Sequence, residues 1–400
     1  MSISPLPGSG SGVDRIRNLV VASSACCLPL EPPGEERFAM YDIAIVGGGP
    51  AGATLARLLG DRYRVLLVER RADTPAGEPG GQKCCGGLLA PDAQRMLSRF
   101  GLGLPKSVLV EPQLFVVRAV DVPRQLERYY QRYYINMDRR AFDRWLLALL
   151  PPGVDLRPGC RLQGYSAGAD CVELHLAAGG KTVSERVRLL VGADGAASLV
   201  RRAMPAAARK PPAYVAIQEW VECPSTPPYF SALFDPAISD YYCWTIPKED
   251  RLLVGAALPR GHGAAERFAL LKTKLAGLGF RLGRTVRREG GLLRRPRSMA
   301  DLASADGRVA LVGEAGGWIS PSSAEGLSYA MRTALALAEA LEPGLDGCGP
   351  RYRRGLRGLA WNIFLKSLKA RCIFSPPLRR LALGSGLHSL TVYPPRESQR

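Results

Sequence analysis

The sequence lacks several features that would mark particular protein classes. It has no run of 18 or more apolar residues, so no segment resembles a membrane-spanning helix. Its three histidines lie far apart, and its ten cysteines form no C-x-x-C pair, so we expect neither a metal site nor a disulfide framework. Thiols scattered through a large chain fit a reducing cytosol. We therefore expect a cytoplasmic protein, or one peripheral to the inner face of the membrane.

Composition is otherwise that of a globular protein. The 400 residues are 46% hydrophobic and 22% charged, which is enough material for two or three domains. Lysine and arginine number 54 against 36 acidic residues, giving a net charge of +18. An anionic membrane, nucleic acid or a generally basic proteome could each explain this charge. No nucleic-acid-binding motif is present, so we expect no nucleic-acid partner.

Residues 1–40 differ from the rest of the chain. They are rich in Ser, Gly and Pro, and their apolar stretch is short. The pair Arg15 and Arg17 before it imitates a secretion signal only weakly. We expect a disordered extension or a misassigned start, with Met40 as the natural first residue.

A glycine-rich turn follows at once. Residues 41–46 predict a buried strand, and residues 53–59 predict a helix. Between them, Gly47 allows a tight turn, Gly49 lets the backbone approach a pyrophosphate, and Gly52 lets helix and strand pack closely. The helix N-terminus would then supply N–H groups to the phosphates.

An acidic residue ends the next predicted strand. Residues 65–68 are apolar and follow Arg64, and Glu69 lies 22 residues after Gly47, where a carboxylate can accept hydrogen bonds from ribose hydroxyls. Strand, glycine turn, helix, strand and acid therefore occur in the order of a dinucleotide-binding unit. An acid at this position disfavours the 2′-phosphate of NADP in this turn.

Two later segments favour FAD over NAD. Residues 189–195 and 308–317 each predict a buried strand that ends in glycine and an acid. Three such segments along the chain suit one extended dinucleotide on a single sheet. No second G-x-G-x-x-G is evident, so the electron donor would be NAD(P)H bound transiently, or another reductant.

These motifs resemble the FAD-binding flavoprotein superfamily that contains para-hydroxybenzoate hydroxylase and the geranylgeranyl reductases. The resemblance implies that Asp194 and Gly195 approach the FAD pyrophosphate and the pyridine nucleotide, and that Gly313 and Glu314 hold the ribityl chain. It also implies that Arg139 reaches FAD; read from the residues alone, Arg139 could instead be a solvated charge at a helix start. The full predicted cofactor set is Gly47, Gly49, Ala51, Gly52, Glu69, Arg70, Arg139, Asp194, Gly195, Gly313, Glu314 and Gly326.

Three segments point to one branch of that superfamily. Residues 83–88 (KCCGGL) resemble the C-G-G segment of geranylgeranyl reductases, and residues 242–248 (YCWTIPK) are similar to their Y-x-W-x-F-P motif. Residues 313–326 resemble the loop that faces the flavin, with the following helix N-terminus favouring a reduced flavin. The chain resembles the CbrA-type bacterial flavoproteins, a branch of this family.

The resemblance suggests three catalytic candidates. Cys85 would lie near the substrate and could give a proton after hydride transfer. Tyr242 and Trp244 alternate on a predicted strand, so both rings face one side and could form a flat apolar wall for an isoprenoid chain. As alternatives, Cys85 is a small residue packed in a turn, and the two rings are ordinary core aromatics.

The end of the chain is basic. Residues 351–380 contain nine Lys or Arg and no acid, interleaved with large apolar side chains. This pattern favours a helix lying in a membrane interface, or else a packing helix with a solvated basic face. We thus expect an isoprenoid or other apolar small-molecule substrate and peripheral membrane contact through this segment.

The predicted fold is α/β. A doubly wound Rossmann-like FAD domain (residues 41–204 and 301–345) would carry an antiparallel-sheet substrate domain (205–300), and a helical basic region (346–400) would close the chain. The leading function is an FAD-dependent reductase of isoprenoid carbon–carbon double bonds. The alternatives are a flavin monooxygenase or halogenase, whose W-x-W-x-I-P signature differs by one residue here, and a flavin-bound redox or stress-response protein.

Overall fold

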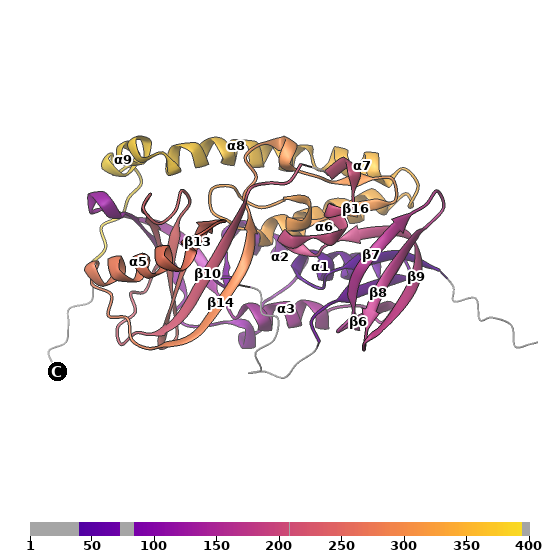
Figure 1. Ribbon diagram of the computed structural model, residues 1–400, viewed down its shortest axis with the longest axis horizontal. Coiled ribbons are helices and arrows are strands. Elements are labelled where there is room, and N and C mark those ends of the chain that lie inside the picture. The colour runs from indigo at the N-terminus through magenta and orange to yellow at the C-terminus, as the bar shows by residue number, and fades with distance from the viewer. Residues whose placement is uncertain (1–39, 73–83, 208, 394–400) are drawn as a thin grey trace, which may run out of the picture. The chain divides into compact units, whose positions relative to one another are not determined.

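Two eight-stranded sheets organise the chain (Figure 1). The computed structural model describes residues 40–72, 84–207 and 209–393. The expectation for the N-terminal segment and the position of Lys83 therefore lie outside the described residues. The two sheets, the helices that cover them and the helical C-terminal region confirm the predicted α/β fold class.

The first sheet contains the glycine turn. Its strand order is β15-β16-β9-β1-β2-β6, and β7 and β8 extend it from β9. β16, β9, β1, β2 and β6 pair in parallel, and the two central strands β1 and β2 are almost wholly buried, as expected where both faces are covered. The strands are β1 (Tyr41–Val46), β2 (Val65–Glu69), β6 (Val154–Pro158), β7 (Arg161–Ala167), β8 (Val172–Ala178), β9 (Lys181–Gly192), β15 (Ala305–Asp306) and β16 (Val309–Leu311).

Helices cover this sheet. α1 (Pro50–Leu59) starts with a proline at its first position, where the missing N–H costs nothing, and its Ala side chains, Leu55 and Leu59 are buried. It packs on α6 (Leu327–Leu341), and both contribute to the same apolar core. The other helices here are α2 (Pro91–Arg99), α3 (Arg139–Ala148), α4 (Leu199–Arg202) and α7 (Cys348–Gly355).

The second sheet draws on more of the chain than the sequence predicted. Its order is β14-β10-β13-β12-β11-β4-β5-β3, so three strands come from residues 88–136, within the segment assigned to the FAD domain. β4 (Leu114–Asp121) pairs in parallel with β11 (Phe230–Phe234), which makes the sheet mixed rather than purely antiparallel. The pairing covers an edge that β11 would otherwise expose. The remaining strands are β3 (Leu88–Leu89), β5 (Leu126–Asn136), β10 (Ala213–Glu222), β12 (Cys243–Lys248), β13 (Arg251–Pro259) and β14 (Thr285–Arg294).

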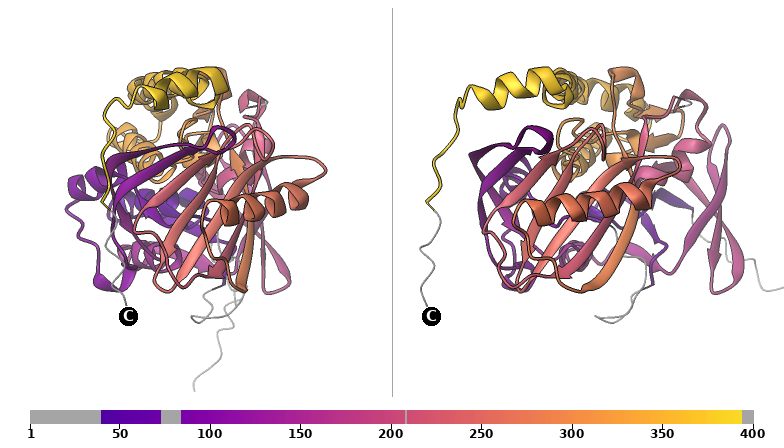
Figure 2. Two further views of the ribbon diagram at one scale, coloured as in Figure 1. Left: turned by 90° about the vertical axis from the view of Figure 1, so that its left-hand side faces the viewer. Right: turned by 60° about the vertical axis from the view of Figure 1, so that its left-hand side comes forward.

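Helices also lie against the second sheet. α5 (Ala264–Gly277) covers one face, where Phe268, Leu271 and Leu275 join the core formed with β13 (Figure 2). α8 (Arg357–Phe374) and α9 (Pro376–Gly384) follow one another along the outside of the structure (Figure 1). Among the described residues, no helix combines the length and apolarity needed to cross a bilayer.

Candidate functional site

The glycine turn between β1 and α1 is shaped by close backbone contacts. A Cβ at Gly52 would lie 1.9 Å from the carbonyl oxygen of Gly47, and a Cβ at Gly47, whose φ is +110°, would lie 2.5 Å from the carbonyl oxygen of Ala193. Both positions therefore require glycine. Gly49 differs, because a Cβ there would meet no atom within 4 Å.

This open space fits a diphosphate. Gly49 is the N-cap of α1 and provides no side-chain cap, so the first N–H groups of the helix face the space in front of it. An uncapped helix N-terminus with room for a ligand is an anion site. The buried Ala51 lies in the first turn, and its Cβ would be 3.0 Å from a Cβ at Gly313, which brings these two predicted residues together.

Glu69 ends β2 beside this turn. Its Oε2 accepts a hydrogen bond from Gly48 N at 2.8 Å, and its Oε1 accepts one from Arg71 Nε at 3.0 Å. Burial acts to raise the pKa of Glu69, but the Arg71 hydrogen bonds and charge outweigh it and the pKa is lowered. The carboxylate is thus ionised and can accept hydrogen bonds from ribose hydroxyls. Arg70 is exposed, whereas Arg71, which the sequence did not single out, lines the adjoining cavity.

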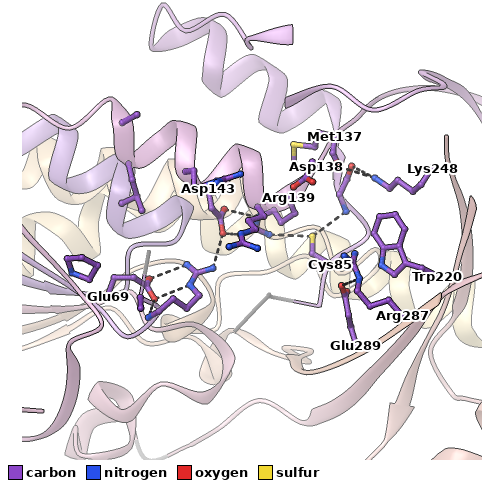
Figure 3. A pocket seen from close by; sticks show the side chains of 18 of the residues that line it. Glu69, Cys85, Met137, Asp138, Arg139, Asp143, Trp220, Lys248, Arg287 and Glu289 are labelled. Carbon is purple, nitrogen blue, oxygen red and sulfur yellow. Dashed lines mark hydrogen bonds and ion pairs between the residues drawn. The ribbon is translucent and has the colours of Figure 1, made fainter. Parts of the chain in front are cut away.

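A cavity of about 390 Å³ begins at Glu69. It runs along the start of α3 toward the second sheet, with Glu69 at one end and Trp220, Arg287 and Glu289 at the other (Figure 3). Its walls carry many charged groups and few aromatic ones. The ionisable lining residues are Glu69, Arg71, Cys85, Asp138, Arg139, Arg140, Asp143, Arg144, Lys248, Arg287 and Glu289.

A chain of ion pairs crosses the middle of the cavity. Asp143 receives Arg139 Nε at 2.8 Å and Arg71 Nη1 at 3.4 Å. The Arg139 side chain is only 10% exposed, so it is not a solvated charge at the start of α3. Burial acts to lower the pKa of Arg139, but Asp143 and Cys85 more than compensate and the pKa is raised. Arg139 is therefore a fixed positive charge in the cavity wall.

The two adjacent cysteines point to different surroundings. Cys85 Sγ accepts hydrogen bonds from Arg139 Nη1 at 3.3 Å and Gly87 N at 3.5 Å, and Cys85 lines the cavity (Figure 3). Cys84 instead packs against an apolar cluster of the second sheet, with its Sγ 3.8 Å from the carbonyl oxygen of Ala216. Of these two cysteines, Cys85 is the one that lines the cavity, and its thiol lies beside the positive charge of Arg139.

Lys248 hydrogen-bonds to the turn that contains Cys85 and Gly87. It ends β12 and is 3% exposed, and its Nζ donates to Gly87 O at 3.1 Å, Met137 O at 3.0 Å and Asn136 Oδ1 at 2.6 Å. Burial lowers its pKa to about 8. The sequence did not mark Lys248 as a site residue, although it ends the predicted Y-x-W-x-x-P motif.

The far end of the cavity is made by paired strands. Gln218 and Trp220 on β10 lie opposite Glu289 and Arg287 on β14. Gln218 Nε2 donates to Cys85 O at 3.2 Å, and the Arg287 guanidinium stacks 4.3 Å from the Trp220 ring centre. These residues were missed because only strand register brings them together, and no local pattern in the sequence reports register.

The remaining predicted FAD residues lie at the ends of β9 and β16. Asp194 Oδ2 accepts Leu199 N at 2.7 Å, while its Oδ1 is shielded from solvent and has no partner among the described residues. Desolvation raises the pKa of Asp194. Gly195, at φ +74°, has open space where a Cβ would be. Glu314 Oε1 accepts Arg294 N at 3.1 Å, and Gly326 is the N-cap of α6.

Tyr242 and Trp244 do lie side by side, with ring centres 5.7 Å apart. They belong to a packed aromatic cluster with Tyr241 and Phe374, and neither is among the residues that line the cavity. Trp244 covers Gly255, where a Cβ would come within 2.2 Å of its ring. Burial raises the pKa of Tyr242 well above its usual value, so its hydroxyl stays protonated.

The glycine turn, the ribose acid and the adjoining cavity define an FAD-binding protein, and residues 40–275 match the model of the family described as FAD binding domain. The chain belongs to this FAD-binding family, whose model covers more than half of it. FAD fits the open turn at Gly49, the ionised Glu69 and the unpartnered Asp194 oxygen.

The chain is similar to curated relatives over most of its length. The chain is 39% identical over 361 residues to Protein CbrA of Escherichia coli O6:H1 (strain CFT073), covering 89% of this chain and 97% of that protein. It is 38% identical over 349 residues to Protein CbrA of Escherichia coli strain K12, covering 87% and 97%.

Solved structures show the same fold in proteins of several activities. A geranylgeranyl bacteriochlorophyll reductase-like protein from Thermoplasma acidophilum aligns with a TM-score of 0.70 at 18% identity, covering 87% of this chain and 89% of that one. The flavin-dependent halogenase CmlS aligns with a TM-score of 0.62 at 18% identity, covering 86% and 72%. The p-nitrophenol 4-monooxygenase PnpA from Pseudomonas putida aligns with a TM-score of 0.57 at 17% identity, covering 88% and 99%.

Proposed function

We propose that this protein reduces carbon–carbon double bonds of an isoprenoid lipid. The observation that carries the proposal is the thiol of Cys85, which lines the same cavity as Glu69 and lies 3.3 Å from Arg139 Nη1. The fold shared with a geranylgeranyl bacteriochlorophyll reductase-like protein agrees with this reaction class.

The cofactor and the protein side chains supply different parts of the proposed reaction. FAD, when bound and reduced, supplies a hydride; Gly47, Gly49, Ala51, Gly52 and Glu69 would hold its adenosine diphosphate half, and Asp194, Gly195, Gly313 and Glu314 the remainder. The reducing equivalents come from NAD(P)H or another donor.

Cys85 gives the second hydrogen. Saturating a double bond needs a proton as well as a hydride, and the Cys85 S–H bond breaks to form the new C–H bond. The electron pair left on sulfur makes a thiolate, which Arg139 stabilises because its charge is fixed by Asp143. A proton from water then restores the thiol, so the thiol is not consumed.

The apolar side of the substrate site is formed by the aromatic cluster. Tyr242 and Trp244 pack in one cluster with Cys84, the neighbour of Cys85. We assign the rings of Tyr242 and Trp244, which lie outside the cavity lining, as the wall along an isoprenoid chain that extends beyond the cavity and binds by apolar contact.

An anaerobic experiment tests the reaction. The bound flavin is reduced by light, which makes the result independent of the natural donor, and a geranylgeranyl lipid is then added. Reoxidation of the flavin together with a hydrogenated lipid supports the proposal. Reoxidation only on admission of air, stimulated by an aromatic substrate, would instead support a monooxygenase or halogenase. A flavin that passes electrons to neither lipid nor oxygen would support a redox sensor.

A further inference from the structure

Helix α8 is apolar on two opposite faces. Its buried face packs on the protein through Leu359, Ile363, Ser367 and Ala370. A second row, Trp361, Leu365 and Leu368, is spaced at helical intervals of four and three residues and points to solvent, with 56%, 48% and 40% exposure. A helix that buries one face and still exposes large apolar side chains on the other has a surface without a partner.

The exposed row continues into the next helix. Leu378 and Leu381 on α9 are 45% and 70% exposed, and Leu387 just beyond it is 69% exposed. α8 and α9 run one after the other along the outside of the structure (Figures 1 and 2), and the exposed apolar side chains follow them along the chain. We call Trp361, Leu365, Leu368, Leu378, Leu381 and Leu387 the apolar ridge.

The chain segment that carries the ridge has charge of one sign. No Asp or Glu occurs between Arg351 and Tyr393. Arg379 and Lys366 pair with Asp121 and Asp92 of other elements. The other cations on α8 and α9 are exposed, namely Arg357, Lys369, Arg371 and Arg380.

We propose that the apolar ridge docks on the surface of an anionic lipid bilayer. Large apolar side chains inserted among basic ones suit the boundary between acyl chains and anionic headgroups. A second copy of this chain is the poorer occupant, because a symmetric contact through the ridge would bring two acid-free basic helices together. This surface is separate from the cavity, and vesicle binding without turnover tests it independently of the proposed reaction.

The helix also links the ridge to the site. Phe374, at the end of α8, lies 4.9 Å from Tyr241 between ring centres and packs in the cluster that contains Trp244. The helix that would rest on lipid therefore ends in the aromatic wall assigned to the substrate.

Vesicle co-sedimentation of the full-length, FAD-loaded protein tests the proposal. The vesicles are phosphatidylcholine with or without phosphatidylglycerol. We expect strong preference for the vesicles with phosphatidylglycerol, weakened as salt is added. Trp361→Ser with Leu365→Ser should weaken binding about tenfold or more, and Lys369→Gln with Arg371→Gln about fivefold for each charge removed.

Matched controls lie elsewhere on the surface. Phe115→Ser removes a side chain that is 58% exposed on β4, and Lys181→Gln removes an exposed charge on β9; neither should change binding. Equal binding to both vesicle types, or binding untouched by the ridge variants, would overturn the proposal. So would a protein that forms dimers in solution and loses them, but not its lipid binding, on Trp361→Ser with Leu365→Ser.

Discussion

Arg139 joins an acid and a thiol in the cavity wall, with Nε 2.8 Å from Asp143 Oδ1 and Nη1 3.3 Å from Cys85 Sγ. The arginine lies at the start of α3 and the cysteine 54 residues earlier in the chain. This contact places one permanent positive charge beside the only cysteine that lines the cavity among the described residues.

Cys85→Ala should keep FAD and lose most of its reductase activity. General acid catalysis contributes about 10²- to 10⁴-fold, so we expect single-turnover reoxidation of reduced flavin by a geranylgeranyl lipid to slow by about that factor. Cys84→Ala is the matched control, because Cys84 packs in the apolar cluster instead of facing the cavity. Equal rates for Cys85→Ala and the unmodified protein would remove Cys85 from the mechanism.

Replacing Asp143 by Asn should destabilise the protein. The Arg139–Asp143 pair is nearly buried, and breaking such a pair leaves an uncompensated charge, which costs about 3 kcal/mol of unfolding free energy. Denaturant unfolding of the FAD-loaded protein measures this. Adding Arg139→Met to Asp143→Asn should cost less than the sum of the two single changes, and strict additivity would speak against the coupling.

Two glycine substitutions should separate folding from cofactor binding. Gly49→Ala adds a methyl group into open space, so the protein without FAD should unfold normally while FAD affinity falls about tenfold or more. Gly52→Ala places a Cβ 1.9 Å from the Gly47 carbonyl oxygen, so it should destabilise the protein even without FAD. Flavin fluorescence and unfolding of the cofactor-free protein report the two effects. Unchanged FAD affinity in Gly49→Ala would place the diphosphate elsewhere.

Lys248 should make stability depend on pH. Burial lowers its pKa to about 8 from a usual value of 10.5, so between these values the unfolded chain binds a proton that the folded protein does not. The unfolding free energy should therefore rise with pH from about 8 to 10.5, by up to about 1.4 kcal/mol per pH unit, relative to Lys248→Met. Cys85, Asp138 and Glu249 act on the same ammonium, favouring its charged form. Parallel curves for the two proteins would refute the assignment.

The nucleotide-binding half of the fold was readable from the sequence because its signals are local. The predicted strand at residues 41–46 coincides with β1, and α1 begins at Pro50, directly after the glycine that caps it. Gly47 and Gly52 occur where the backbone itself forbids a side chain, and Glu69 is a fixed number of residues away. Such features need no knowledge of distant contacts.

The rest of the site depends on pairing between distant segments. The register between β10 and β14 places Trp220 opposite Arg287. Lys248 contacts the Cys85–Gly87 turn because the fold brings the end of β12 next to that turn. The sequence predicted the rings of Tyr242 and Trp244 on one side of a strand, and their centres are 5.7 Å apart, but it did not predict their enclosure in a cluster with Phe374 of α8. Neither strand register nor the packing of the C-terminal helix α8 produces a periodic pattern in the sequence.

The parallel pair of β4 and β11 has a consequence for dissecting the protein. Residues 205–300 cannot be cut out as a self-contained module, since β11 would lose its neighbour and present unpaired N–H and C=O groups along an open edge. The polypeptide passes from the nucleotide sheet into the second sheet twice and returns to the nucleotide sheet each time. Grafting the second sheet of a relative onto this nucleotide sheet would therefore require exchanging two separate stretches of sequence together.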